Sequence, residues 1–393
     1  MMKYLYLFLL LVLSISPVFS QKSIDKLKIN QIQVLGTHNS YARPVDPALL
    51  EYGDAAFGKL MGSYLKNMAP EQQAFYKEYH PNEVPMSEGL KYLHPSFPEQ
   101  LDAGLRSLEI DIYYDPTGNR FNDPAGHRLL KSMNKEVSDF DTTGLGNPGF
   151  KVMHIADFDF RTHYPTLKEA LQSLKKWSDG NPGHIPIYIM IEAKDTGIPI
   201  FPDPAPVLPF DEKAFDELDH EIVSIIGRDK IITPDDVRQD YSTLREAVLA
   251  NNWPTVKEAR GKFIFLMLPG SAGNSRNQAY VKNHPNLENR VIFMQAVNPD
   301  EPFAAFLLLD NAIVRQKEIR EAVKAGYLVR TRSDIETYEA KTNDYTRAKA
   351  AFSSGAQVIS TDFFRKGNTY GTDYYVTLPG KGEAIANPVN GKP

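Results

Sequence analysis

Several polar side chains stand at the ends of predicted strands, where a parallel sheet would gather them. His38 and Asn39 follow the strand predicted at 31–35, and they supply a group that titrates near neutral pH and a neutral oxygen ligand. Glu109 and Asp111 are two residues apart in an otherwise apolar strand, so both point to one face. On a buried face two carboxylates repel each other unless a cation lies between them. We therefore interpret the pair as metal ligands, with an exposed strand face as the alternative.

The next two predicted strands also end in polar residues. His154 closes the strand predicted at 150–155, and a packed, hydrogen-bonded core histidine is the alternative to a chemical role. Glu192 directly follows the apolar run 185–191, where a buried carboxylate needs a partner. Lys194, two residues on, is either that structural partner or a contact for a substrate phosphate.

Taken together, these positions indicate metal-assisted chemistry on a phosphodiester. The candidate ligands are one amide oxygen and three carboxylates, a set that suits Ca²⁺, or less well Mg²⁺, rather than Zn²⁺. The two imidazoles then remain available for acid/base catalysis. Arg330 and Asp362, at the ends of the last two predicted strands, are candidates for binding sugar hydroxyls or phosphate, and a salt bridge at the barrel end is their alternative.

The elements that must position these residues alternate between strands and helices. Such alternation with buried strands predicts an α/β fold with a (β/α)₈ barrel of the TIM type, possibly distorted, and an open doubly wound sheet is the alternative. No Gly-rich phosphate loop follows a predicted strand, which argues against the open sheet. The predicted strands are 31–35, 107–114, 150–155, 185–191, 262–268, 291–295, 327–331 and 357–361. The predicted helices are 166–177, 215–226, a segment capped by Thr243, 311–325 and 344–352.

Four segments describe the predicted domain organisation. Residues 1–20 have the layout of a secretory signal peptide, with an N-terminal anchor as the alternative. Residues 21–393 form one catalytic domain in this interpretation. Within it, 44–98 is a long insertion after the first strand that covers the barrel mouth, and 365–393 is an irregular tail rich in Gly, Pro and Asn.

Composition excludes several classes of function. The 393 residues contain no cysteine, so Cys nucleophiles, thiolate zinc sites and iron–sulfur clusters are ruled out. The net charge is −5 and no long basic stripe is present, which argues against nucleic-acid binding and leaves only transient contact with a membrane surface. Nothing in the sequence indicates an obligate protein partner. The signal-like start predicts export to the periplasm or the medium.

The ordered set of motifs resembles the phosphatidylinositol-specific phospholipases C. The order is His-Asn, Glu-x-Asp, His and Glu, and the stretches 98–106, 360–364 and 387–389 are similar to the secreted Ca²⁺-dependent bacterial branch. The resemblance implies Ca²⁺ held by Asn39, Glu109, Asp111 and Glu192, with His38 and His154 as the catalytic imidazoles. It further implies attack by the inositol 2-hydroxyl on phosphorus, which releases diacylglycerol and a cyclic inositol phosphate from phosphatidylinositol-type lipids.

Two other functions fit the same residues less well. A glycerophosphodiester phosphodiesterase acting on soluble substrates would share the barrel, the metal and a His pair. Its opening motif is usually His-Arg-Gly, whereas this chain has Gly36-Thr37-His38-Asn39-Ser40. A non-catalytic barrel that binds inositol lipids or glycans is the other alternative, although every candidate position holds a chemically competent residue.

Overall fold

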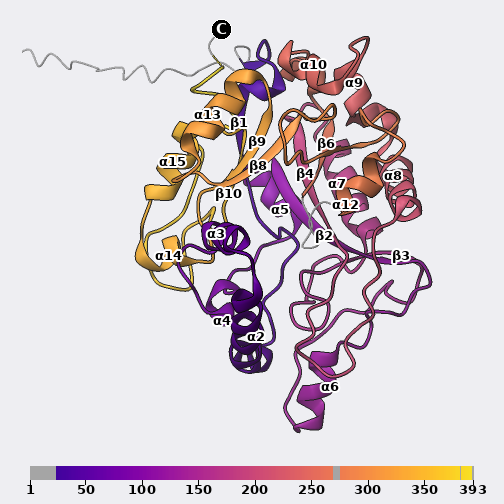
Figure 1. Ribbon diagram of the computed structural model, residues 1–393, viewed down its shortest axis with the longest axis vertical. Helices are drawn as coiled ribbons and strands as arrows, with labels where there is room; N and C mark the ends of the chain where they lie inside the picture. Colours follow the sequence, from indigo (N-terminus) through magenta and orange to yellow (C-terminus); the bar gives the residue numbers. More distant parts are fainter. Residues whose placement is uncertain (1–23, 269–274, 381, 392–393) are drawn as a thin grey trace, which may run out of the picture.

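The computed structural model describes residues 24–268, 275–380 and 382–391, and it has an α/β fold around a curled sheet (Figure 1). The predicted signal segment lies outside the described residues. The hydrogen-bonded path runs β5-β6-β4-β2-β1-β10-β9-β8, and β7 pairs with β6. The strands are β1 (Ile32–Gly36), β2 (Ser107–Asp115), β3 (Gly149–Val152), β4 (Ile187–Lys194), β5 (Ile231–Ile232), β6 (Phe263–Met267), β7 (Ile292–Met294), β8 (Phe306–Asn311), β9 (Leu328–Arg332), β10 (Val358–Ser360) and β11 (Ile385–Ala386).

The sheet curls into a distorted barrel, as predicted. An isolated parallel bridge between Gln295 and Phe306 brings the end of β7 to the start of β8, and so joins the two ends of the curled sheet. The β1–β2 ladder is also short, with Gly36 paired to Ser107. A Cβ added at Gly36 would lie 2.4 Å from the Ser107 Cβ, so only glycine allows the two strands to approach this closely.

Helices lie along both flanks of the curled sheet, with α13 and α15 on one flank and α7, α8 and α12 on the other (Figure 1). The predicted capping residues Thr166 and Thr243 do cap helices, and each accepts a hydrogen bond from a backbone N–H in the first turn. The α-helices are α2 (Pro47–Asn67), α3 (Pro70–Tyr79), α4 (Met86–Gly89), α5 (Phe97–Asp102), α6 (Ala125–Ser132), α7 (Leu167–Gly180), α8 (Glu212–Ile226), α9 (Pro234–Arg238), α10 (Leu244–Leu249), α11 (Val256–Ala259), α12 (Ser275–Val281), α13 (Gln316–Ala325), α14 (Tyr338–Thr342) and α15 (Thr346–Ser354).

Two strand predictions were wrong in ways that matter for the site. The third predicted strand is β3, which pairs antiparallel with β2 and is therefore not one of the parallel strands. Sequence analysis also missed the parallel strands β5 and β8, and β8 ends at Asn311, the first residue of the region predicted as helix 311–325. The first error arises because a short apolar run does not reveal the direction of its strand. The second arises because such a run does not show where strand periodicity changes to helical periodicity.

The insertion at 44–98 contains α2, α3 and α4 and extends from one end of the sheet (Figure 1). Its last part returns to the sheet through Tyr92 and His94, which are both buried. Among the described residues, no helix is both long and apolar enough to cross a membrane. The insertion thus delivers Tyr92 and His94 to the region where the strands end, and its predicted role as a cover of the barrel mouth stays a prediction.

Candidate active site

The segment after β1 carries His38 and Asn39 into the barrel mouth. Asn39 has a positive φ of 45°, a conformation that Asn tolerates better than most residues. Its Nδ2 donates to the hydroxyl of Tyr92 at 2.6 Å, and Tyr41 Oη donates to its Oδ1 at 3.4 Å. The Asn39 side chain is therefore fixed on both sides by tyrosines.

Glu109, Asp111 and Glu192 come together as an acidic cluster, as predicted. Asp111 on β2 is the direct register partner of Glu192 on β4, and one carboxylate oxygen of each of the three residues lies within 4.8 Å of the others. Burial raises the pKa of Glu109 to about 8 and raises that of Asp111. Asp111 Oδ1 is buried without a hydrogen bond, whereas Oδ2 faces the ammonium of Lys194. Closely spaced hard oxygens from several carboxylates are suited to a divalent cation such as Ca²⁺.

Two cationic side chains lie against this cluster. Lys194 Nζ is 2.9 Å from Asp111 Oδ2 and 3.0 Å from Glu192 Oε2. Although burial alone lowers the pKa of Lys194, these two carboxylates raise it above the ordinary lysine value. Arg330 on β9 is buried, lies 2.9 Å from Glu109 Oε2 and also pairs with Asp310. Arg330 thus forms a salt bridge at the strand ends, and its predicted contact with substrate stays a prediction.

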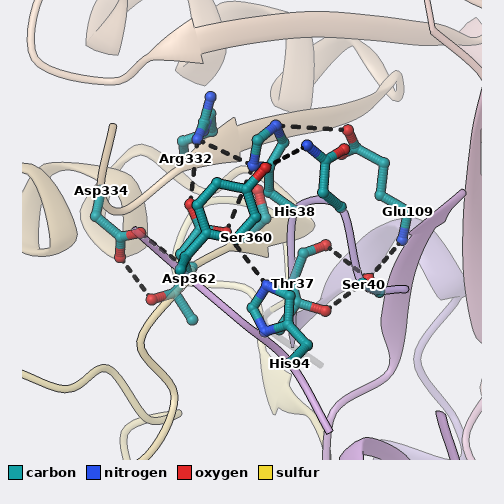
Figure 2. A network of polar contacts seen from close by, with 12 residues as sticks. Thr37, His38, Ser40, His94, Glu109, Arg332, Asp334, Ser360 and Asp362 are labelled. Atoms are coloured by element: carbon teal, nitrogen blue, oxygen red, sulfur yellow. Dashed lines mark hydrogen bonds and ion pairs between the residues drawn. The ribbon is translucent and has the colours of Figure 1, made fainter. Parts of the chain in front are cut away.

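His38 lies between the acidic cluster and Asp362 (Figure 2). Its Nε2 is 3.8 Å from Glu109 Oε1, and its Nδ1 is 3.4 Å from Asp362 Oδ1. Arg332 Nη2 is 3.4 Å from the same Nδ1. Burial, together with the positive charge of Arg332, lowers the pKa of His38 to about 3. The ring is therefore in its neutral form.

Besides His38, Asp362 contacts residues of the insertion and of the segment at the end of β9 (Figure 2). His94 Nε2, from the insertion, lies 3.5 Å from Asp362 Oδ1, and Arg332 Nη2 lies 3.6 Å from Oδ2. The backbone N–H of Asp362 donates to Asp334 Oδ1 at 2.8 Å. These ion pairs agree with the alternative of a salt bridge at the barrel end, and the predicted contact of Asp362 with substrate stays a prediction.

His154 reaches the site by a route that the sequence did not indicate. Because β3 runs antiparallel to β2, with Val152 paired to Ile112, the chain beyond β3 returns alongside β2 towards Asp111. His154 Nδ1 lies 2.8 Å from Asp159 Oδ2, within a tight loop in which the N–H of Ile155 donates to the Asp159 carbonyl. The ring is thus oriented by a carboxylate, with its Nε2 left for other contacts.

Sequence reasoning missed His94, Tyr92, Asp159 and Arg332. A signal was available for Arg332, which stands two residues after Arg330 on β9 and therefore shares its face. The other three lie in irregular segments, where no periodicity reports the direction of a side chain.

Comparison with known proteins agrees with this geometry. The family model described as "Phosphoinositide phospholipase C, Ca2+-dependent" matches residues 27–388. The chain belongs to this family. Its members are phosphodiesterases that depend on Ca²⁺, and the acidic cluster of this phospholipase C family member can hold such an ion.

Two solved structures show the same fold at low sequence identity. The Ca²⁺-dependent phosphoinositol-specific phospholipase C from a Pseudomonas species has 14% identity and a TM-score of 0.54, and the match covers 94% of this chain and 99% of that one. The enzyme from Streptomyces antibioticus has 16% identity and a TM-score of 0.51, with 86% and 95% covered. No curated protein sequence matches the chain significantly.

Proposed function

We propose that this phospholipase C cleaves phosphatidylinositol-type lipids to diacylglycerol and a cyclic inositol phosphate, with His38 and His154 as the acid/base pair. One arrangement carries the proposal: an acidic cluster suited to Ca²⁺ stands beside two imidazoles that each have a carboxylate partner. Asn39, Glu109, Asp111 and Glu192 would hold the ion. When bound, Ca²⁺ stabilises negative charge on phosphoryl oxygens and makes a coordinated hydroxyl more acidic.

His38 is the general base in this mechanism. If Asp362 accepts the proton of Nδ1, the lone pair of His38 is on Nε2, which lies 3.8 Å from Glu109 and so faces the acidic cluster. His38 Nε2 takes the proton of the inositol 2-hydroxyl while that oxygen forms its bond to phosphorus. Asp362 holds the ring in the correct orientation and stabilises the imidazolium that results.

His154 is the general acid. Asp159 lies at 2.8 Å from its Nδ1, so the carboxylate orients the ring. His154 Nε2 gives its proton to the glycerol oxygen as the phosphorus–oxygen bond to diacylglycerol breaks. The two rings thus exchange one proton each with the substrate, and the charges balance over the step.

The proposed function includes a location outside the cytoplasm, which rests on the N-terminal sequence. A signal-like start would direct the chain out of the cytoplasm, to the periplasm or the medium, where residues 21–393 would act as one domain on membrane lipid during brief surface contacts.

The test is cleavage of phosphatidylinositol vesicles by the purified protein in Ca²⁺ and in chelator. We expect diacylglycerol and cyclic inositol phosphate only in Ca²⁺, and a loss of at least about 100-fold in kcat for His38→Ala and His154→Ala. His220→Ala, on the exposed face of α8, is the matched control. Cleavage of soluble glycerophosphodiesters but not of the lipid would replace the proposal with the glycerophosphodiesterase alternative, and binding without turnover would support a non-catalytic barrel.

A further inference from the structure

The ammonium of Lys194 lies against the acidic cluster that could hold a metal ion. It is the last residue of β4 and lies two positions after Glu192, so both side chains leave the same face of the strand. Its ammonium bridges Asp111 and Glu192 at 2.9 and 3.0 Å. The Asp111 carboxylate is fully buried, and the lysine side chain is 15% exposed.

This ammonium and a Ca²⁺ ion would use the same two carboxylates. Ca²⁺ binds carboxylate oxygens at about 2.3–2.6 Å. The oxygens of Asp111 and Glu192 belong to the one cluster that could hold a metal among the described residues. An ion seated there would lie within a few ångströms of Nζ if the lysine kept its contacts, and like charges at such a distance in a buried site repel strongly. The two cations therefore exclude each other.

Lys194 can move away, whereas the other cation of the site cannot. Arg330 is held between Glu109 and Asp310, and Asp310 is not part of the cluster, so this arginine keeps a partner whatever happens to Glu109. Lys194 has a flexible four-carbon stem at the end of its strand, and part of it reaches solvent. Its partners are two carboxylates of the cluster itself.

We infer that Lys194 is an internal counter-cation of the acidic cluster, which Ca²⁺ displaces, and that the displaced ammonium then binds the substrate phosphate. This inference rests on the proposed function. It unites the two sequence interpretations of Lys194, since the structural partner and the phosphate contact become two positions of one side chain. It also couples the two ligands, because phosphate gains its contact only when the metal has entered.

The first experiment measures Ca²⁺ binding by calorimetry for the wild type and for Lys194→Met, which keeps most of the stem and removes the charge. We expect the variant to bind Ca²⁺ at least about tenfold more tightly, because the competing ammonium is gone. Lys213→Met is the control, since that side chain is 74% exposed on α8. Unchanged or weaker binding in Lys194→Met would overturn the inference.

Two further measurements separate displacement from simple repulsion. In a crystal structure with Ca²⁺ we expect Nζ to have left both Asp111 Oδ2 and Glu192 Oε2, and a lysine that keeps both contacts would contradict the inference. We also expect Lys194→Met to bind myo-inositol 1-phosphate about tenfold more weakly than wild type in Ca²⁺ and equally in chelator; an equal loss in both conditions would also count against it. If the wild type binds no Ca²⁺, the proposed function fails as well, whereas Ca²⁺ binding with no effect of Lys194→Met removes only this inference.

Discussion

Asp362 Oδ1 lies 3.4 Å from Nδ1 of His38, although the two residues are separated by most of the chain. They meet because β1 and β10 are adjacent parallel strands whose C-terminal ends share one edge of the sheet. The carboxylate is therefore placed to set which ring nitrogen of His38 carries the proton. This pairing makes the role that we propose for His38, acceptance of a proton, testable through a residue that need not touch the substrate.

Asp362→Asn should reduce kcat on phosphatidylinositol by about 100-fold or more, with a smaller change in KM. The amide keeps the shape of the side chain but loses the charge that stabilises the His38 imidazolium. Steady-state kinetics in saturating Ca²⁺ measure the effect. Asp240→Asn, at an exposed turn, is the control, and a wild-type kcat for Asp362→Asn would remove Asp362 from the mechanism.

His94→Phe should lower kcat by about tenfold while leaving KM nearly unchanged. The His94 ring lies beside Tyr92 and Phe364, so phenylalanine preserves the packing and removes only the nitrogen that is 3.5 Å from Asp362. Thermal unfolding checks that the fold is intact, and we expect a Tm within a few degrees of wild type. Partial recovery of kcat in His94→Gln, which restores a hydrogen-bond donor, would show that His94 acts by positioning Asp362 and not by packing. Full activity in His94→Phe would contradict this role of His94.

Tyr92→Phe should weaken Ca²⁺ binding by about tenfold. The Tyr92 hydroxyl accepts the hydrogen bond from Asn39 Nδ2 at 2.6 Å, and without it the Asn39 oxygen is less well oriented towards the cluster. Calorimetric titration with Ca²⁺ measures the change. Tyr241→Phe, an exposed tyrosine, serves as the reference, and equal Ca²⁺ affinity in the two variants would show that the Tyr92 hydroxyl does not contribute to Ca²⁺ binding.

The buried carboxyl of Asp219, which lies outside the candidate active site, should make the stability of the fold depend on pH. Burial raises its pKa to about 6 in the folded protein, from an ordinary value of 3.8. Because the folded state holds this proton more tightly, its contribution to stability is full below about pH 4 and is lost as pH rises through 6. Asp219→Asn should therefore gain stability relative to wild type between pH 4 and 7, by on the order of 3 kcal/mol.

Urea unfolding at a series of pH values measures this difference. Asp219 shares Arg290 with Asp216, whose side chain is 61% exposed, so Asp216→Asn is the matched control and should show little dependence on pH. A pH-independent difference between Asp219→Asn and wild type would mean that the Asp219 proton is bound equally in the folded and unfolded states.

The sequence by itself determined the fold class and the acidic cluster. Strand alternation placed Glu109 and Asp111 on one face, and the apolar run before Glu192 placed that residue at a strand end. Two capped helices were also predicted correctly at Thr166 and Thr243. These features are local, because the spacing of apolar and capping residues along a few turns or strand positions is enough to specify them.

Only the tertiary structure decided which side chains contact His38 and His154. The direction of β3, and with it the route of His154 to the cluster, depends on pairing with β2 across more than thirty residues. His94 reaches Asp362 from an irregular part of the insertion, and Lys194 meets Asp111 through the β2–β4 register. Such contacts depend on strand order, register and loop path, which arise from packing of the whole chain and leave no periodic pattern in the sequence.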